Sequence, residues 1–137
     1  MEEALLALGN GLPIFLVHSG TSLAILVIGA LIYSRITPHD EMALIRSGNV
    51  AAALSFGGAI VGLALPLAFS LAAAVSLWDL AIWGAVALVL QLVAFRLADL
   101  FLKGISARIE AGEISAAIML VSVKLATAFI NSAAISG

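Results

Sequence analysis

A long stretch without any charged residue, from Asn49 to Val75, is the feature that most limits how this chain can fold. It is longer than the ~20 apolar residues that a helix needs to cross the hydrocarbon core of a bilayer. Hydrophobic residues make up 64% of the 137 residues and charged residues only 10%. A soluble domain of this size needs far more polar surface. The sequence therefore predicts an integral membrane protein in contact with a lipid bilayer.

Four segments of this kind account for nearly all of the chain, and we expect each one to be a transmembrane helix. The expected spans are residues 13–33, 49–75, 78–101 and 114–135. A short acidic tail, Met1–Gly11, precedes them and is expected to lie against the membrane surface. Polar connectors at 34–48 and 102–113 and a tight turn at Ser76 join the spans. The predicted fold is all-α, a four-helix bundle forming a single transmembrane domain, residues 1–137.

The two polar connectors resemble each other in sequence, which suggests an internal repeat. The matching positions are Ile45, Gly48, Ala52 and Ala53 with Ile109, Gly112, Ala116 and Ala117. Chance is the alternative, because Ala and Ile are abundant here, but the shared glycine and the matching helix lengths favour a duplication. The sequence thus predicts two tandem repeats, about 13–75 and 78–135, each with two spans. Such repeats are parallel and are related by an axis along the membrane normal.

Basic residues predict the orientation in the membrane. Of the six Lys and Arg residues, all but Lys124 lie in or beside the two connectors. Cytoplasmic loops carry an excess of Lys and Arg. We therefore expect a multi-pass protein of the bacterial inner membrane with both connectors in the cytoplasm and both termini in the periplasm.

The first connector contains a helix-start pattern, Thr37-Pro38-His39-Asp40-Glu41. Thr is a suitable N-cap and Pro suits the first helical position. The two carboxylates would then lie against the positive end of the helix dipole. A short interfacial helix is expected to follow, at residues 42–46.

The second span carries a close-packing pattern. Gly58 and Gly62 form a GxxxG motif, which lets another helix approach closely. Pro66 removes a backbone hydrogen bond to Gly62, so a bend is expected there. Ordinary packing is the more common explanation of both features. These glycines and the Ala-rich fourth span nevertheless suggest a homo-oligomer, most simply a dimer.

Polar residues inside the spans are the best candidates for a functional site. Lys124 is the basic residue nearest the middle of a span, and lipid exposure there costs ~2.5–3.5 kcal/mol. We expect its amine to point into the protein and to hydrogen-bond Gln91 or the Gly62 carbonyl, which lie at similar depth. Lys124 would then have one of two roles. It could form a site for an ion or a proton, or it could serve only helix packing. Nearer the outer face, His18 and Asp79 could form a pH-sensitive pair, with Asn131 close by, or could simply join helices.

The sequence contains no recognisable catalytic constellation. Cysteine is absent, so there is no thiolate nucleophile and no cysteine metal site. No phosphate loop or basic nucleic-acid motif is present. We expect no enzymatic activity, no cofactor or metal site and no nucleic-acid partner.

A set of short segments spread over most of the chain forms a recognisable pattern: Ile32–His39, Leu44-Ile45, Ala51-Ala52, Gly58, Gly62, Pro66-Leu67, Asp79, Trp83-Gly84, Ala87–Val89, Gln91-Leu92, Asn131 and Ala133-Ala134. In these segments the chain resembles the YjfL family of bacterial inner-membrane proteins, known as domain of unknown function number 350. Lys124 stands where the family pattern leads us to expect a small residue. The resemblance implies a small multi-span protein of the cytoplasmic membrane. It also implies genes for a membrane-remodelling protein and an ATP-grasp ligase nearby in some bacteria.

Two functions remain open at this point. The first is a membrane scaffold or envelope-stress component whose connectors dock a peripheral, membrane-remodelling partner in the cytoplasm. The second is an oligomeric channel or transporter for a small ion, proton or solute. The interfacial helices of the connectors favour docking, whereas Lys124 favours transport.

Overall fold

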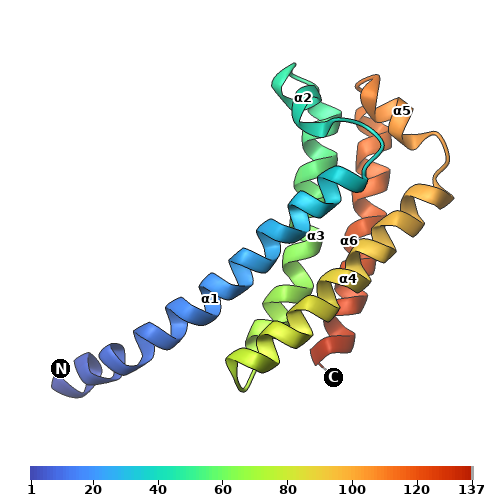
Figure 1. The fold of residues 1–137 in the computed structure, drawn as a ribbon. Coiled ribbons are helices and arrows are strands. Elements are labelled where there is room, and N and C mark those ends of the chain that lie inside the picture. Colours follow the sequence, from blue (N-terminus) through green and yellow to red (C-terminus); the bar gives the residue numbers. More distant parts are fainter. Residues whose placement is uncertain (137) are drawn as a thin grey trace.

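The computed structural model describes residues 1–136, and their regular structure is entirely helical. The helices are α1 (Glu2–Ile36), α2 (Glu41–Arg46), α3 (Val50–Ala73), α4 (Leu77–Phe101), α5 (Ile105–Glu110) and α6 (Ile114–Ser136). Of these, α1, α3, α4 and α6 are long and apolar enough to cross a membrane (Figure 1). The predicted all-α fold with four membrane-crossing helices is confirmed.

The long helices form a bundle whose two connectors lie at the same end (Figure 1). α3 and α6 run side by side in one direction, and α1 and α4 run in the other. We call the end that holds residues 37–49 and 102–113 the connector end. Both chain termini and the α3–α4 turn lie at the opposite end. This arrangement agrees with the relative placement expected from the sequence, while the side that faces the cytoplasm stays a prediction.

The two connectors share one local geometry. α2 and α5 are both followed by a glycine at positive φ, Gly48 at 88° and Gly112 at 85°. The N–H groups of these glycines donate to the carbonyls of Ile45 and Ile109 at 3.0 and 2.9 Å. Positive φ is readily adopted only by glycine, which explains the residue type at both positions. A duplication would produce this likeness, but the duplication itself stays a prediction.

α1 is longer than the sequence led us to expect. It begins at Glu2 and has 35 residues, which corresponds to about 52 Å at ~1.5 Å per residue. Residues 1–17 are all exposed, and this half of α1 extends away from the other helices (Figure 1). The expected surface tail is thus part of the helix, whereas the start of the membrane span at residue 13 stays a prediction, because α1 is longer than a bilayer crossing needs. The cause is the run of good helix formers before Pro13, which continues the apolar helix.

Gly58 and Gly62 of α3 face neighbouring helices of the same chain. A Cβ atom on Gly58 would lie 2.5 Å from Val121 Cγ2 on α6, and one on Gly62 would lie 2.7 Å from Phe95 Cζ on α4. The motif thus lets α3 approach its own neighbours closely. The expectation that these two glycines form a face for a second copy of the chain is not supported. Pro66 is buried within the continuous α3.

Candidate functional site

Lys124 lies at the centre of a buried polar cluster near the connector end. Its side chain is 0% exposed. The ammonium donates to the Tyr33 hydroxyl at 2.8 Å and lies 3.3 Å from Asp99 Oδ1. It also lies 4.6 Å from the Tyr33 ring centroid and 5.1 Å from that of Phe95, within the range of cation–π attraction. One side chain of α6 is thereby bound to α1 and α4.

The expected inward direction of Lys124 agrees with the structure, but the expected partners do not. Side chains of a helix point towards its N-terminus, and the N-terminus of α6 lies at the connector end. The amine therefore reaches Tyr33 and Asp99, which lie close to the ends of their helices. Gln91 instead donates to the backbone carbonyl of Lys124 at 3.4 Å.

A second polar group lies deeper in the bundle, between α4 and α6. Gln91 is fully buried, and its Oε1 accepts a hydrogen bond from Asn131 Nδ2 at 2.7 Å. Thr127 lies 3.5 Å from Gln91 Nε2. These contacts are between neutral groups, and we interpret them as interhelical packing.

The expected pairing of His18 with Asp79 is not formed in the part of the chain that the structure describes. His18 Nδ1 lies 2.9 Å from the Ile14 carbonyl of its own helix. The Asp79 carboxylate accepts from the Val75 N–H at 3.1 Å and so closes the α3–α4 turn. Asn131, expected beside this pair, contacts Gln91 instead. His18 and Asp79 are thus each bonded within their own segment, whereas Asn131 joins α6 to α4.

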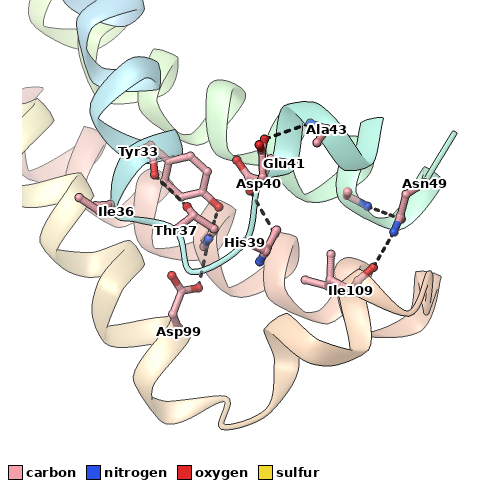
Figure 2. A network of polar contacts seen from close by, with 12 residues as sticks. Tyr33, Ile36, Thr37, His39, Asp40, Glu41, Ala43, Asn49, Asp99 and Ile109 are labelled. Carbon is pink, nitrogen blue, oxygen red and sulfur yellow. Dashed lines mark hydrogen bonds and ion pairs between the residues drawn. The ribbon is translucent and has the colours of Figure 1, made fainter. Parts of the chain in front are cut away.

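The helix start in the first connector differs from the sequence prediction by several residues. Asp40 is the N-cap of α2 and accepts from the Ala43 N–H at 3.0 Å. Thr37 instead follows α1 and donates to the Tyr33 carbonyl at 2.8 Å (Figure 2). Pro38 therefore lies before the helix. Asp accepts this bond better than Thr does, which accounts for the shift.

Glu41 has a different environment from its neighbour Asp40. Its side chain is 0% exposed and points into the bundle beside His39, whose side chain is 3% exposed (Figure 2). His39 Nε2 lies 3.7 Å from Glu41 Oε1, which is beyond hydrogen-bond distance. Within residues 1–136, neither the imidazole nitrogens nor the carboxylate oxygens have a hydrogen-bond partner. The helix dipole alone therefore does not account for Glu41.

Burial shifts the ionisation of both connector residues. It raises the pKa of the Glu41 carboxyl to about 7, although attraction to Lys124 opposes the change. Burial also lowers the pKa of His39. Both shifts favour the neutral side chain, as expected for groups removed from water.

Tyr33 and Asp99 are the members of this cluster that the sequence reading missed. Tyr33 lies at the end of the first expected span and Asp99 near the end of the third, and neither is among the candidate residues named from the sequence. One signal was available: Asp99 and Lys124 are opposite charges in different spans, and such charges usually pair inside a membrane protein. Chemically, the cluster can hold and exchange protons. Residues 1–136 contain no group of three or more His, Asp or Glu side chains placed to hold a metal ion.

Comparison with known proteins gives one family. The sequence model of the domain of unknown function DUF350 matches residues 7–135. The chain is 37% identical over 110 residues to the "UPF0719 inner membrane protein YjfL" of Escherichia coli K12, and the match covers 80% of this chain and 83% of the relative. The protein of the same name in Escherichia coli O157:H7 gives the same values. No solved structure matches.

Proposed function

This chain belongs to the DUF350 family of membrane proteins. We propose that it is a platform on which a peripheral protein docks at the inner membrane. Its four membrane-crossing helices and its likeness to an inner-membrane protein make it a multi-pass inner-membrane protein. The docking partner is a cytoplasmic protein that acts on the membrane surface. Such a partner would place this chain among envelope-stress components.

The observation that carries this proposal is the joining of the two connectors into one unit. The Asn49 side chain donates to the carbonyls of Ile109 and Glu110 at 3.0 and 3.1 Å (Figure 2). α5 buries Ile109, and the partly buried Leu44 and Ile45 of α2 pack against the same cluster. The charged side chains of Arg46 and Arg108 stay exposed. The connector end thus offers a fixed, charged surface just outside the predicted membrane.

Site-specific photo-cross-linking in cells tests the docking proposal. A photoreactive residue at Met42 or Ala107, both exposed at the connector end, should give an adduct with the same partner. The same residue at Trp78, in the opposite turn, serves as the control and should not. Asn49→Ala should weaken both adducts, because it separates the connectors. Equal adducts at all three positions, or none at the connectors, would contradict docking.

A channel or transporter is the second candidate, and the Lys124–Asp99 pair favours it. Ionisable residues inside a membrane often mark ion or proton pathways. Flux measurements on purified protein in liposomes, comparing the wild type with Lys124→Met, separate this candidate from docking. Flux that depends on Lys124 would support transport, and unchanged background leakage would contradict it.

The homo-oligomer also remains a proposal, but with a different basis. Gly58 and Gly62 are used within the chain. Residues 1–17 of α1 are all exposed and apolar on several sides, as Leu5, Phe15 and Val17 show. We therefore propose that this part of α1 forms the dimer contact.

A further inference from the structure

The Glu41 carboxylate is the buried charge that the rest of the cluster does not balance. Buried polar atoms are nearly always hydrogen-bonded, and an isolated buried carboxylate is costly. Both Glu41 oxygens and both His39 ring nitrogens nevertheless lack hydrogen-bond partners in the described chain. Lys124 and the Tyr33 hydroxyl favour the ionised carboxylate, but these two groups are already bonded to each other. Full neutralisation of Glu41 while α2 stays in place therefore needs a bound proton or cation.

We infer that Glu41 and His39 form a buried binding site for one exchangeable proton, and that the proton holds α2 against the bundle. This proton site lies in the first connector and is independent of the proposed docking partner and of transport.

The two positive charges near Glu41, Lys124 and Arg96, are both engaged by other groups. Lys124 on α6 is already bound to Asp99 on α4 and to Tyr33 on α1. Arg96 on α4 lies 3.8 Å from the same Asp99 and donates to the Ile36 carbonyl. Glu110 on α5 adds a negative charge near His39. One proton on Glu41 makes the cluster neutral and provides a hydrogen-bond donor.

Loss of this proton should loosen α2. The carboxylic acid would release H⁺ to solvent and leave a carboxylate near Asp99, whose neighbouring cations, Lys124 and Arg96, are already engaged. That charge can be relieved by exposing Glu41 to water. α2 has only six residues and is joined to α1 by the non-helical residues 37–40. Its movement therefore needs no change in a membrane-crossing helix.

The ionisation behaviour supports a site that works near neutral pH. Burial raises the pKa of Glu41 to about 7, and attraction to Lys124 limits the rise. The pKa of His39 is lowered, so the imidazole is neutral over the same range and does not replace the proton. Proton exchange at Glu41 would thus occur under ordinary cellular conditions.

Infrared difference spectroscopy on the full chain in lipid nanodiscs tests proton binding directly. A protonated buried carboxyl should give a carbonyl band that disappears as the pH rises through about 7. Glu41→Gln should remove the band. Glu3→Gln, which changes an exposed glutamate at the start of α1, is the matched control and should keep it. A band that survives Glu41→Gln would overturn the assignment.

Spin-label distances test the movement of α2. The chain has no cysteine, so Met42→Cys with Ala107→Cys gives one label on α2 and one on α5. The distance distribution should broaden above the midpoint of the infrared titration in the wild type and stay narrow at every pH in Glu41→Gln. The same pH dependence of the distance distribution in the wild type and in Glu41→Gln would show that the Glu41 proton does not control the position of α2.

Two further measurements separate proton binding from a folding defect and from metal binding. If Glu41→Gln does not fold, Glu41→Asp keeps an acid in place and should shift the infrared midpoint. Replacing sodium with choline at constant ionic strength should leave the midpoint unchanged. A missing acid band together with a sodium-dependent label distance would show that a metal cation, rather than a proton, occupies the site.

Discussion

Lys124 and Asp99 form an ion pair at 3.3 Å between α6 and α4, with the lysine side chain 0% and the aspartate side chain 10% exposed. The pair connects two neighbouring membrane-crossing helices that are separated in the sequence by α5. Buried ion pairs often add little net stability, yet removal of one partner leaves a buried charge that costs several kcal/mol. The pair therefore makes the two positions dependent on each other.

Lys124→Met should be destabilising because it leaves Asp99 with Arg96 as its remaining cationic neighbour, at 3.8 Å. We expect a loss of ~3 kcal/mol, at the lower end of the range for a broken buried pair. Lys124→Met combined with Asp99→Leu should recover most of that loss. Thermal unfolding in nanodiscs measures both variants. Additive losses would show that the two residues do not interact.

Tyr33→Phe should lower stability through the loss of one hydrogen bond. The hydroxyl accepts from the Lys124 ammonium at 2.8 Å, and a hydrogen bond to a charged group contributes ~1.5–3 kcal/mol. The phenylalanine ring keeps the contacts with Phe56 and Phe95. Ser34→Ala, whose hydroxyl bonds locally to the Leu31 carbonyl, is the control and should change stability by less than ~0.5 kcal/mol. Equal melting curves for Tyr33→Phe and wild type would contradict the contact.

Stability should decrease as the pH rises from about 4.5 to about 7 because of Glu41. Its pKa is higher in the folded than in the unfolded chain, so the folded protein binds more protons in this window. Linkage then makes the free energy of unfolding fall with pH. Glu41→Gln removes this part of the dependence. Unfolding curves at a series of pH values provide the measurement, and an unchanged slope in Glu41→Gln would count against a buried acid.

His39 should act in the opposite direction at lower pH. Its folded pKa lies below the ordinary value of 6.5, so the unfolded chain binds more protons below that pH. The stability that comes from a neutral His39 is therefore lost as the pH falls through its folded pKa. His39→Gln should flatten the acid side of the stability profile while leaving the Glu41 slope. A profile unchanged by His39→Gln would show that the imidazole is not buried.

Most of the fold could be predicted from two local features, the apolar composition of the spans and the residues at the turns between them. The uncharged run from Asn49 to Val75 contains α3, and the glycine that the two connectors share in sequence, Gly48 and Gly112, follows α2 and α5 at positive φ. These features are local, since they depend on hydropathy and backbone conformation over a few residues. The start of α1 was missed because Pro13 and the acidic residues before it suggest a boundary that the apolar helix formers override.

The candidate site was predictable only in part because it depends on tertiary contacts. That Lys124 must avoid lipid follows from the cost of exposing a charge in a bilayer. Its partners depend on the tilt of the helices, which brings Tyr33 and Asp99 together at the connector end. Burial of Glu41 depends on how α2 folds back over the bundle, and no sequence period in a six-residue helix reveals that.

Gly58→Ala should destabilise the chain without dissociating an oligomer. The added methyl would meet Val121 Cγ2 at 2.5 Å, and overpacking of this kind costs ~1–3 kcal/mol. Gly57→Ala, where the space is open, is the control and should be neutral. Melting temperature reports the destabilisation, and light scattering of the detergent complex reports the mass. If Gly58→Ala dissociated a dimer without changing the melting temperature, Gly58 would contribute to a contact between two chains, as the sequence suggested.

Cysteine labelling should place the connector end in the cytoplasm. The chain contains no native cysteine, so single substitutions give unambiguous probes. Ser47→Cys lies in the first connector, and Val75→Cys lies in the α3–α4 turn, where Val75 is 92% exposed. Ser136→Cys, at the end of α6, provides a second probe for the opposite side.

In intact cells, a membrane-impermeant reagent should label Val75→Cys and Ser136→Cys, while Ser47→Cys should react only after the inner membrane is opened. The expectation follows from the basic residues that flank both connectors, because positive charge is retained in the cytoplasm. Labelling with the sides exchanged would refute the orientation and leave the fold intact. Labelling of Ser47→Cys and Val75→Cys from one side would mean that α3 does not cross the membrane, and the parallel arrangement of the repeats would fail with it.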